Sequence, residues 1–230
     1  DGFDISGTNI TLRHCHVENF DDAYCMKPNS RGSNLSHCTT DLHFEDSSIS
    51  FGVGASVGSV GPSKDVNCIA NSSFKRISFK TPIKAIYVKP NPCPNGAAVD
   101  GTGIIDNILY EDIYAEMPLW WSIYVSTQQQ HQPGAGTNTG CSFFFPIPGH
   151  KCPTQPCVPV TNLKLKNVFM KDALLSPGIM RCNESNPCTG WEWNNVTVKS
   201  LQDWPVNSNN FLCHAIEGAN FTDVTPGCTD

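Results

Sequence analysis

Three aspartates near the start of the chain have the spacing to form one acid–base site. Four short apolar segments recur along the chain. The residue five positions before the last residue of each segment is acidic, apolar or basic. The ends are Ser6, Lys27, Gly58 and Lys89, and the residues before them are, in the same order, Asp1, Asp22, Val53 and Lys84. If the segments stack as neighbouring strands about 4.8 Å apart, Asp1 and Asp22 lie on one line, with Asp21 beside them.

Carboxylates packed this closely repel one another, so at least one of them is expected to have a raised pKa. A carboxyl group of raised pKa can act as a general acid, and an ionised partner can activate water. Glycoside hydrolysis requires this pair of roles. A simpler interpretation is also open, in which Asp21 and Asp22 cap a turn and Asp1 belongs to a frayed terminus.

The segments that would position these residues are short, alternate in polarity and contain β-branched side chains, as strands do. They are residues 3–6, 24–27, 55–58, 86–89, 123–126 and 178–181. The periodicity of long helices is absent, and Gly, Pro, Asn and Ser separate the segments.

A second pattern recurs along the chain, with large apolar residues at positions 0, +3 and +5 and polar residues at +1 and +2. Position 0 is Leu12, Phe44, Phe74, Tyr110, Leu165 and Trp193 in the successive copies. Asn or Asp fills position +2 in four copies, as Asp46, Asp112, Asn167 and Asn195. Repeats of roughly 20 to 35 residues with two or three short strands predict an all-β fold, the right-handed parallel β-helix, in which each coil packs on the one before it. A β-sandwich would not keep one template in register so often.

We expect the β-helix coils over residues 1–200 and a disulfide-pinned tail over residues 201–230. Long insertions at 91–103 and 127–159 interrupt the repeat and are candidate binding elements, or else surface flaps held by disulfides. Trp120 and Trp121 precede the second insertion and could offer a face for stacking sugars, unless they pack beneath it.

Twelve cysteines and six glycosylation sequons point to the secretory route and an oxidising compartment. Because no CxxC pair occurs, disulfides are favoured over zinc, and the pairs Cys182–Cys188 and Cys213–Cys228 are expected. The remaining pairings cannot be read from the spacing. The sequons begin at Asn9, Asn34, Asn71, Asn183, Asn195 and Asn220. No metal or other cofactor is expected.

The formal net charge of −6 argues against nucleic acid as the main partner. No apolar run reaches membrane-spanning length, so no membrane partner is expected either. The chain opens on Asp1 without a signal peptide, and a β-helix that began there would expose an unpaired strand edge. We therefore expect missing N-terminal coils, with that edge covered by an earlier part of the polypeptide, a cleaved segment or a neighbouring subunit.

These motifs resemble those of glycoside hydrolase family 28, the polygalacturonases and their relatives. The family has Asn-Thr-Asp-Gly, then Asp-Asp before a strand that ends in Lys, then Gly-His-Gly with Ser-x-Gly-Ser, and then Arg-x-Lys. This chain has DGFDIS at 1–6, DDAYCMK at 21–27, GVGASVGS at 52–59 and YVK at 87–89. The order and spacing agree, and the likeness covers about residues 1–200.

The resemblance implies a secreted hydrolase of acidic, pectin-like polysaccharide that inverts anomeric configuration. It implies Asp21 as the general acid, with Asp1 and Asp22 activating water. It also implies that Lys89 binds a carboxylate or hydroxyl of the polysaccharide.

Two family residues are replaced, because Val53 stands at the histidine position and Tyr87 at the arginine position. Val53 cannot hydrogen-bond a sugar, and Tyr87 cannot pair bidentately with a uronate as arginine does. Tyr87 and Lys27 are nevertheless expected to line the substrate site with Lys89. Lys84 would add to a basic groove there, unless these lysines are solvated or paired with acids.

Two functions therefore stay open at the level of sequence. One is the extracellular glycoside hydrolase. The other is a catalytically impaired glycoprotein that kept the fold for carbohydrate binding or a structural role in an extracellular assembly. A polysaccharide lyase is a third alternative, but lyases on this fold usually need Ca²⁺, and no dense acidic cluster beyond Asp1, Asp21 and Asp22 is visible.

Overall fold

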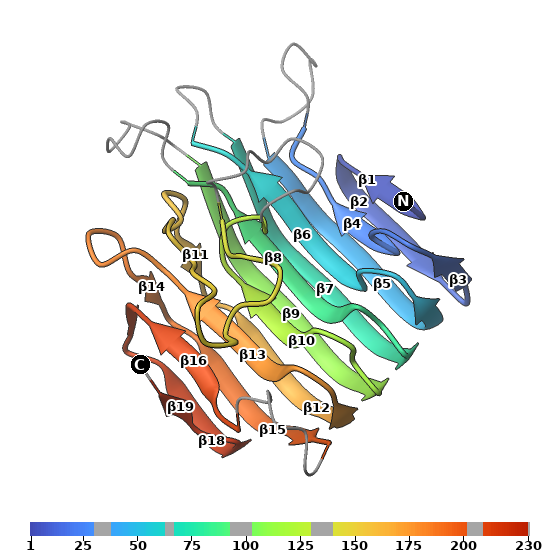
Figure 1. Ribbon diagram of the computed structural model, residues 1–230. Coiled ribbons are helices and arrows are strands. Elements are labelled where there is room, and N and C mark those ends of the chain that lie inside the picture. The colour runs from blue at the N-terminus through green and yellow to red at the C-terminus, as the bar shows by residue number, and fades with distance from the viewer. Residues whose placement is uncertain (30–37, 63–66, 93–102, 130–139, 202–208, 230) are drawn as a thin grey trace.

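A computed structural model describes residues 1–29, 38–62, 67–92, 103–129, 140–201 and 209–229. These residues form strands and no helix, and the strands pair in parallel into two long sheets. Figure 1 shows them side by side as a solenoid, from the N-terminal edge at β1 to the C-terminal edge at β18 and β19. The predicted parallel β-helix is therefore confirmed. Within the described residues no helix is long and apolar enough to cross a membrane.

The first sheet has eight strands, one from each successive coil. They are, in spatial order, β1 (Phe3–Ile5), β4 (Tyr24–Met26), β6 (Ala55–Val60), β8 (Lys84–Pro90), β10 (Trp121–Val125), β13 (Ser176–Arg181), β16 (Phe211–His214) and β19 (Cys228–Thr229). Phe3, Tyr24, Ala55, Ile86, Ile123 and Gly178 pair in one continuous register. The six predicted segments are thus equivalent strands of this sheet.

The second sheet has eleven strands and includes the three longest, which run through two sides of the coil. They are β2 (Thr8–Arg13), β3 (His16–Asn19), β5 (Cys38–Phe51), β7 (Asn67–Lys80), β9 (Gly103–Glu116), β11 (Val160–Thr161), β12 (Lys164–Ala173), β14 (Cys188–Thr189), β15 (Glu192–Ser200), β17 (Ile216–Glu217) and β18 (Asn220–Thr225). β2 and β3 both pair with β5, because β5 is long enough to span them.

The predicted apolar stack runs through the middle of the molecule. Register pairs join, in order, Leu12, Phe44, Phe74, Tyr110, Leu165 and Trp193. The ring centroids of Phe44 and Phe74 are 5.1 Å apart, and those of Phe74 and Tyr110 are 4.8 Å apart. Leu12 is only partly buried, while the other five side chains are buried.

The backbone conformation explains why Asn and Asp occupy position +2 of the repeat. Asp46, Asp112, Asn167 and Asn195 have positive φ angles between 49° and 55°, the left-handed region that Asn and Asp tolerate best. Their side chains also bond from coil to coil, since the Asn167 amide donates to Asp112 at 2.9 Å and the Asn195 amide to Asn167 at 3.1 Å. A bend is therefore repeated at the same place in each coil.

The C-terminal segment differs from the expected tail. β16 pairs with β13, β18 pairs with β15, and β19 pairs with β16, so the coils continue through Thr229. Phe221 extends the apolar stack by pairing with Trp193. The β-helix therefore extends beyond residue 200.

Disulfides join neighbouring coils and close loops. The structure contains Cys182–Cys188 and Cys213–Cys228, the two expected pairs, together with Cys38–Cys68 and Cys141–Cys152. Cys157 is also disulfide-bonded, whereas Cys15 and Cys25 are free thiols.

Candidate active site

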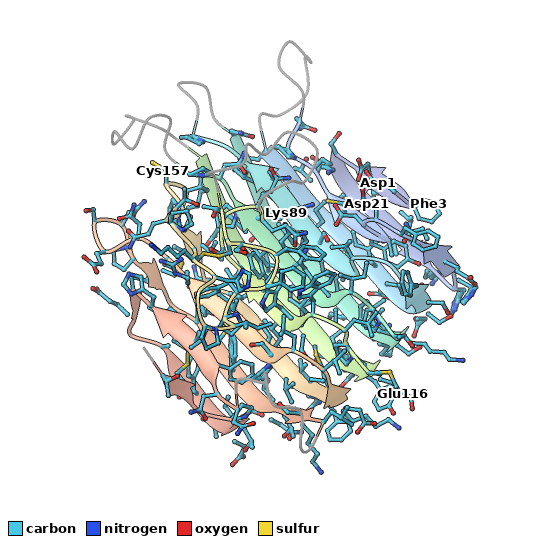
Figure 2. All side chains as sticks on the ribbon, in the orientation of Figure 1. Asp1, Phe3, Asp21, Lys89, Glu116 and Cys157 are labelled. Carbon is cyan, nitrogen blue, oxygen red and sulfur yellow. A yellow bond between two sulfur atoms is a disulfide. The ribbon has the colours of Figure 1, made fainter. Side chains whose placement is uncertain are left out.

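The turns that lead into β1 and β4 carry the three aspartates and bring them together. The backbone amide of Gly2 donates to the Asp22 carbonyl, and that of Val53 donates to the Asp21 carbonyl, each at 2.8 Å. One oxygen from each carboxylate of Asp1, Asp21 and Asp22 lies within 4.8 Å of the others. Figure 2 shows Asp1 and Asp21 together near Phe3 at the N-terminal end of the first sheet, with Lys89 farther along it.

Asp22 is the buried member of this group and has a full set of polar partners. Lys89 donates from Nζ to Asp22 Oδ2 at 2.5 Å, and Ser56 donates from Oγ to Asp22 Oδ1 at 2.5 Å. Asp22 and Lys89 are each only 3% exposed. Asp1 and Asp21 are exposed and can meet a solute directly.

The pKa of Asp22 is lowered, whereas the spacing of the three carboxylates led us to expect a raised pKa in the group. Burial by itself raises the pKa of this carboxyl, but the charge and hydrogen bond of Lys89 and the hydrogen bond from Ser56 outweigh it, so the pKa is lowered. Asp22 is therefore an anion at neutral pH. The ammonium group of Lys89, which the strand-end spacing does not place beside Asp22, outweighs repulsion among the three carboxylates.

Lys27 is half-buried and paired with acids rather than free to bind a ligand. Its Nζ lies 3.6 Å from Asp4 Oδ1 and 3.9 Å from Asp22 Oδ2. Burial lowers the pKa of Lys27, while Cys25, Asp22 and Asp4 raise it more, so the ammonium stays charged. The acid-paired alternative for this lysine is the one observed.

Tyr87 does not line an open site. Its side chain is fully buried in a second apolar cluster on the outer face of the first sheet, together with Val53, Trp121 and Tyr124. Tyr87 is therefore not accessible to a solute in this structure, and its expected contact with substrate stays a prediction. Val53 is 6% exposed and offers only methyl groups at this position.

Lys84 lies beneath the same cover and is fully buried. Its Nζ is 4.1 Å from the centroid of the Tyr87 ring and 5.4 Å from that of Trp121. No hydrogen-bond partner reaches that Nζ among the described residues. Burial, and next the charge of Lys89, lower the pKa of Lys84 to about 7. The basic groove expected from Lys27, Lys84 and Lys89 is therefore not formed as an open surface.

The cover is the described part of the second long insertion, residues 140–158, which we call the flap. The Trp121 indole donates to the Phe145 carbonyl at 2.8 Å, and Arg181 donates to the Cys152 carbonyl at 2.5 Å. Trp120 is half-buried and packs against Phe143. The alternative in which the tryptophans pack beneath the insertion is thus the one that the structure supports.

Two residues of the site were missed at the level of sequence. Ser56 hydrogen-bonds Asp22, and Cys25 lies beneath it, with Sγ 3.0 Å from the Gly58 carbonyl oxygen. Burial is the largest cause that raises the pKa of the Cys25 thiol to about 12, so the thiol is uncharged. Cys25, Ser56 and Tyr87 are register equivalents, so the strand register could have placed the first two beside Asp22.

Two groups of acidic and thiol ligands within the described residues are close enough to share a metal ion. They are Asp1, Asp21 and Asp22, and Asp4, Asp22 and Cys25. Both groups depend on Asp22, whose charge is already matched by Lys89 at 2.5 Å. This pairing disfavours a cation at either place.

Comparison with known proteins agrees with the motifs. The model of glycosyl hydrolases family 28 matches residues 1–143, which is more than half of the chain. The chain belongs to this glycoside hydrolase family.

The relatives are fungal polygalacturonases. A polygalacturonase of Penicillium janthinellum is 27% identical over 203 residues, which cover 88% of this chain and 46% of the relative. Endopolygalacturonase I of Aspergillus aculeatus is 28% identical over 199 residues, which cover 86% of this chain and 43% of the relative. The chain spans about half the length of the curated relatives it matches.

A solved structure shows the same fold. Endopolygalacturonase I from Stereum purpureum, in complex with two galacturonate molecules, superposes with a TM-score of 0.58 at 16% identity. The superposition covers 99% of this chain and 53% of that one.

Proposed function

We propose that this chain is part of a secreted glycoside hydrolase that cleaves an acidic, pectin-like polysaccharide by acid–base catalysis. The observation that carries the proposal is the convergence of three carboxylates within 4.8 Å, in a chain that belongs to family 28. Membership of a hydrolase family favours hydrolysis over lyase chemistry. Because the chain spans about half of each relative, the proposal concerns the whole protein of which these coils form part.

The roles of the carboxylates follow from their surroundings. Asp21 is exposed and can approach a glycosidic oxygen, which suits a general acid. Asp22 is held as an anion by Lys89 and can orient and activate water together with Asp1. Lys89 then acts mainly by fixing Asp22, and its direct contact with a sugar requires that this ion pair loosen.

Inversion of configuration is proposed from the family and not from the separation of the carboxylates. The distances of at most 4.8 Å are shorter than the roughly 6.5–9.5 Å found between the carboxyl groups of most inverting enzymes. NMR of the first-formed product would test this directly, because the anomer released before mutarotation reports the stereochemistry.

A second candidate function is a carbohydrate-binding or structural glycoprotein with little hydrolytic activity. The observation that favours it is the burial of Val53 and Tyr87 under the flap. Neither side chain can supply the polar contacts of the family histidine and arginine. Sugar binding would then rest on the exposed Asp1 and Asp21.

Secretion is proposed from the disulfides and from the sequons. Asn9, Asn71, Asn195 and Asn220 are exposed, and Asn183 is half-exposed, so each can accept a glycan. Asn34 lies outside the described residues. An oxidising compartment is where disulfides such as Cys38–Cys68 persist.

The deciding experiment is a reducing-sugar assay of the full natural protein over a panel of acidic and neutral polysaccharides. The test variant is Asp21→Asn, which keeps the shape and removes the acid. The control is Asp223→Asn, an exposed aspartate on β18. Cleavage that is lost in the first variant and kept in the second supports the enzyme. Binding without cleavage in all three proteins supports the second candidate.

A further inference from the structure

A second pocket lies on the first sheet, between the flap and the C-terminal coils. Its volume is ≈ 220 Å³, and it is lined by Phe145, Cys152, Arg181, Leu212, Cys213 and His214. The first two belong to the flap, Arg181 is on β13, and the other three are on β16. Figure 1 shows the flap, in yellow, in front of β10 and β13, with β16 as the next strand of the sheet.

This pocket is not a continuation of the acid–base site. Lys89, Ser126 and Arg181 directly follow register partners on β8, β10 and β13, so they occupy equivalent positions on successive coils. Ser126, which lies between the two basic residues, is fully buried, and so are Tyr124 and Ile179 in the neighbouring row. A ligand bound at Arg181 is therefore separated from Lys89 by covered strands.

Arg181 brings to the pocket a positive charge that no acidic side chain among the described residues balances. Its Nη1 donates to the uncharged carbonyl oxygen of Cys152 at 2.5 Å. Burial lowers the pKa of Arg181, and only Tyr124 opposes this effect, so no carboxylate of the described chain offsets the cost of burying the guanidinium. Arg76 is the contrast, because Asp46 accepts two of its hydrogen bonds, at 2.6 and 3.0 Å. A guanidinium has five N–H donors, so Arg181 keeps donors for an anion.

The rest of the lining suits a sugar ring that carries a carboxylate. Leu212 and Phe145 offer apolar surface to the C–H face of a ring. His214 Nε2 lies 3.1 Å from Gln155 Nε2, and both side chains keep further hydrogen-bonding atoms for hydroxyl groups. The volume is below the roughly 300–1,000 Å³ of pockets that hold drug-sized ligands, so the pocket has room for one sugar residue.

We propose that this pocket is a second binding site, in which Arg181 pairs with the carboxylate of one uronic acid residue and Leu212 and Phe145 contact its ring. Arginine binds carboxylates through two parallel N–H bonds, which a neutral sugar cannot accept in the same way. The uronate is either a free monosaccharide or the terminal residue of an oligosaccharide. The inference goes beyond the proposed hydrolysis and does not depend on it, because binding here needs no cleavage.

Glu184 places a negative charge beside the pocket. Its Oε1 lies 3.5 Å from His214 Nε2, and its side chain is 76% exposed, so solvent and salt screen the charge. Glu184→Gln should therefore strengthen the binding of a uronate by a few-fold at low salt, and less at high salt. This variant leaves Arg181 and the flap unchanged, so its effect reports charge in the pocket alone.

The test is isothermal titration calorimetry of the full natural protein with galacturonate, and with galactose as the neutral analogue. Galacturonate should bind at least about 10-fold more tightly, and Arg181→Gln should remove this preference, because a charge-assisted hydrogen bond is lost. Glutamine keeps a donor for the Cys152 carbonyl. Arg76→Gln is the matched control and should leave the affinity unchanged, since its guanidinium is already paired with Asp46.

Leu212→Glu is a second variant that leaves the bond between Arg181 and Cys152 in place. It supplies Arg181 with a carboxylate of the protein itself, so galacturonate binding should be lost while the unfolding midpoint stays near that of the unchanged protein. Trigalacturonate identifies the source of the ligand. Tighter binding than the monosaccharide indicates a chain end, weaker binding indicates a free uronate, and either must depend on Arg181.

Three results would overturn the inference and leave the proposed hydrolase standing. They are equal affinity for galacturonate and galactose, an unchanged preference in both Arg181→Gln and Leu212→Glu, and acetate binding as tight as that of galacturonate. The last would show a general anion site without selection for a sugar. Loss of polysaccharide cleavage in Asp21→Asn tests the hydrolase separately, because that residue is not part of this pocket.

Discussion

Lys89 and Asp22 form a buried ion pair that spans the first sheet from β8 to the turn before β4. The Nζ–Oδ2 distance is 2.5 Å, and both residues are 3% exposed. Ser56, on the strand between them, bonds the other carboxylate oxygen. The pair fixes the one buried carboxylate of the site, so its loss should affect stability and charge together.

Lys89→Met should therefore destabilise the protein by about 3–5 kcal/mol, because it leaves a buried carboxylate unpaired. Chemical unfolding at neutral pH would measure this. Lys166→Met is the control, since Lys166 pairs with Glu111 on the exposed surface and should cost no more than about 1 kcal/mol. A small effect of Lys89→Met would mean that water reaches Asp22.

The contribution of this ion pair to stability should depend on pH in a defined direction. The pKa of Asp22 is lower in the folded state than its ordinary value of 3.8, so its contribution to stability is present above that pH. The contribution should be lost as pH falls below 3.8 and through the lower folded pKa. Acid titration of stability should therefore be steeper in the unchanged protein than in a Lys89→Met, Asp22→Asn double variant. Parallel curves would contradict the assignment.

Lys84 should destabilise the fold over a range of pH that the sequence alone does not reveal. Its pKa is lowered to about 7 in the folded state from an ordinary value of 10.5, first by burial and then by Lys89. The unfolded chain binds the proton more strongly, so stability should fall as pH decreases from 10.5 to about 7 and then level off.

Lys84→Met should remove that slope and stabilise the protein near pH 6 by on the order of a few kcal/mol. The measurement is the free energy of unfolding at several pH values. The exposed Lys80→Met is the control and should leave the slope unchanged. If Lys84→Met keeps the slope, the amine is not shielded by the flap.

The strand register and the apolar stack could be predicted because every coil repeats one template. Position +2 of that template is a left-handed bend, which explains why Asp46 and Asn167 are polar there. The last copy is hard to recognise from the sequence because its +5 position is Pro226, although Phe221, Asp223 and Val224 fit the pattern. The burial of Tyr87 and Lys84 could not be predicted, since it depends on how a non-repeating insertion folds back on the sheet. The Lys89–Asp22 pair could not be predicted either, because strand-end offsets do not show how far a lysine side chain reaches.

Phe74→Ala should cost about 3–5 kcal/mol of stability, because it opens a cavity in the stack. Phe74 is fully buried between Phe44 and Tyr110, with ring centroids 5.1 Å and 4.8 Å away. Phe20→Ala is the control, since Phe20 is 83% exposed, and should change stability by no more than about 0.5 kcal/mol. Equal effects of the two changes would be inconsistent with a continuous core.

Processing can be checked by mass spectrometry of natively produced protein. Glycans are expected at Asn183, Asn195 and Asn220, which are accessible in the fold, and at Asn34. An alkylating reagent should label Cys15 in the folded protein and Cys25 only after unfolding, because Cys25 is fully buried. Unmodified asparagines together with reactive thiols at Cys182 and Cys188 would argue against a secreted, oxidised protein.

Activity on unsubstituted polygalacturonan should be very weak, because the positions of the family histidine and arginine are Val53 and Tyr87. Val53 offers no hydrogen bond, and Tyr87 lies fully buried under the flap. Tyr87→Arg should therefore not restore activity and should destabilise the protein, since the guanidinium would be placed in an apolar cluster.

If hydrolysis of any polysaccharide is found, Asp21→Asn should lower its rate by orders of magnitude with little change in stability, because the acid is removed from an exposed site. Initial rates of reducing-sugar release, compared with the unfolding midpoint of each variant, separate the two effects. Rapid cleavage of plain polygalacturonan by the unchanged protein would show that neither the histidine nor the arginine is needed on this scaffold.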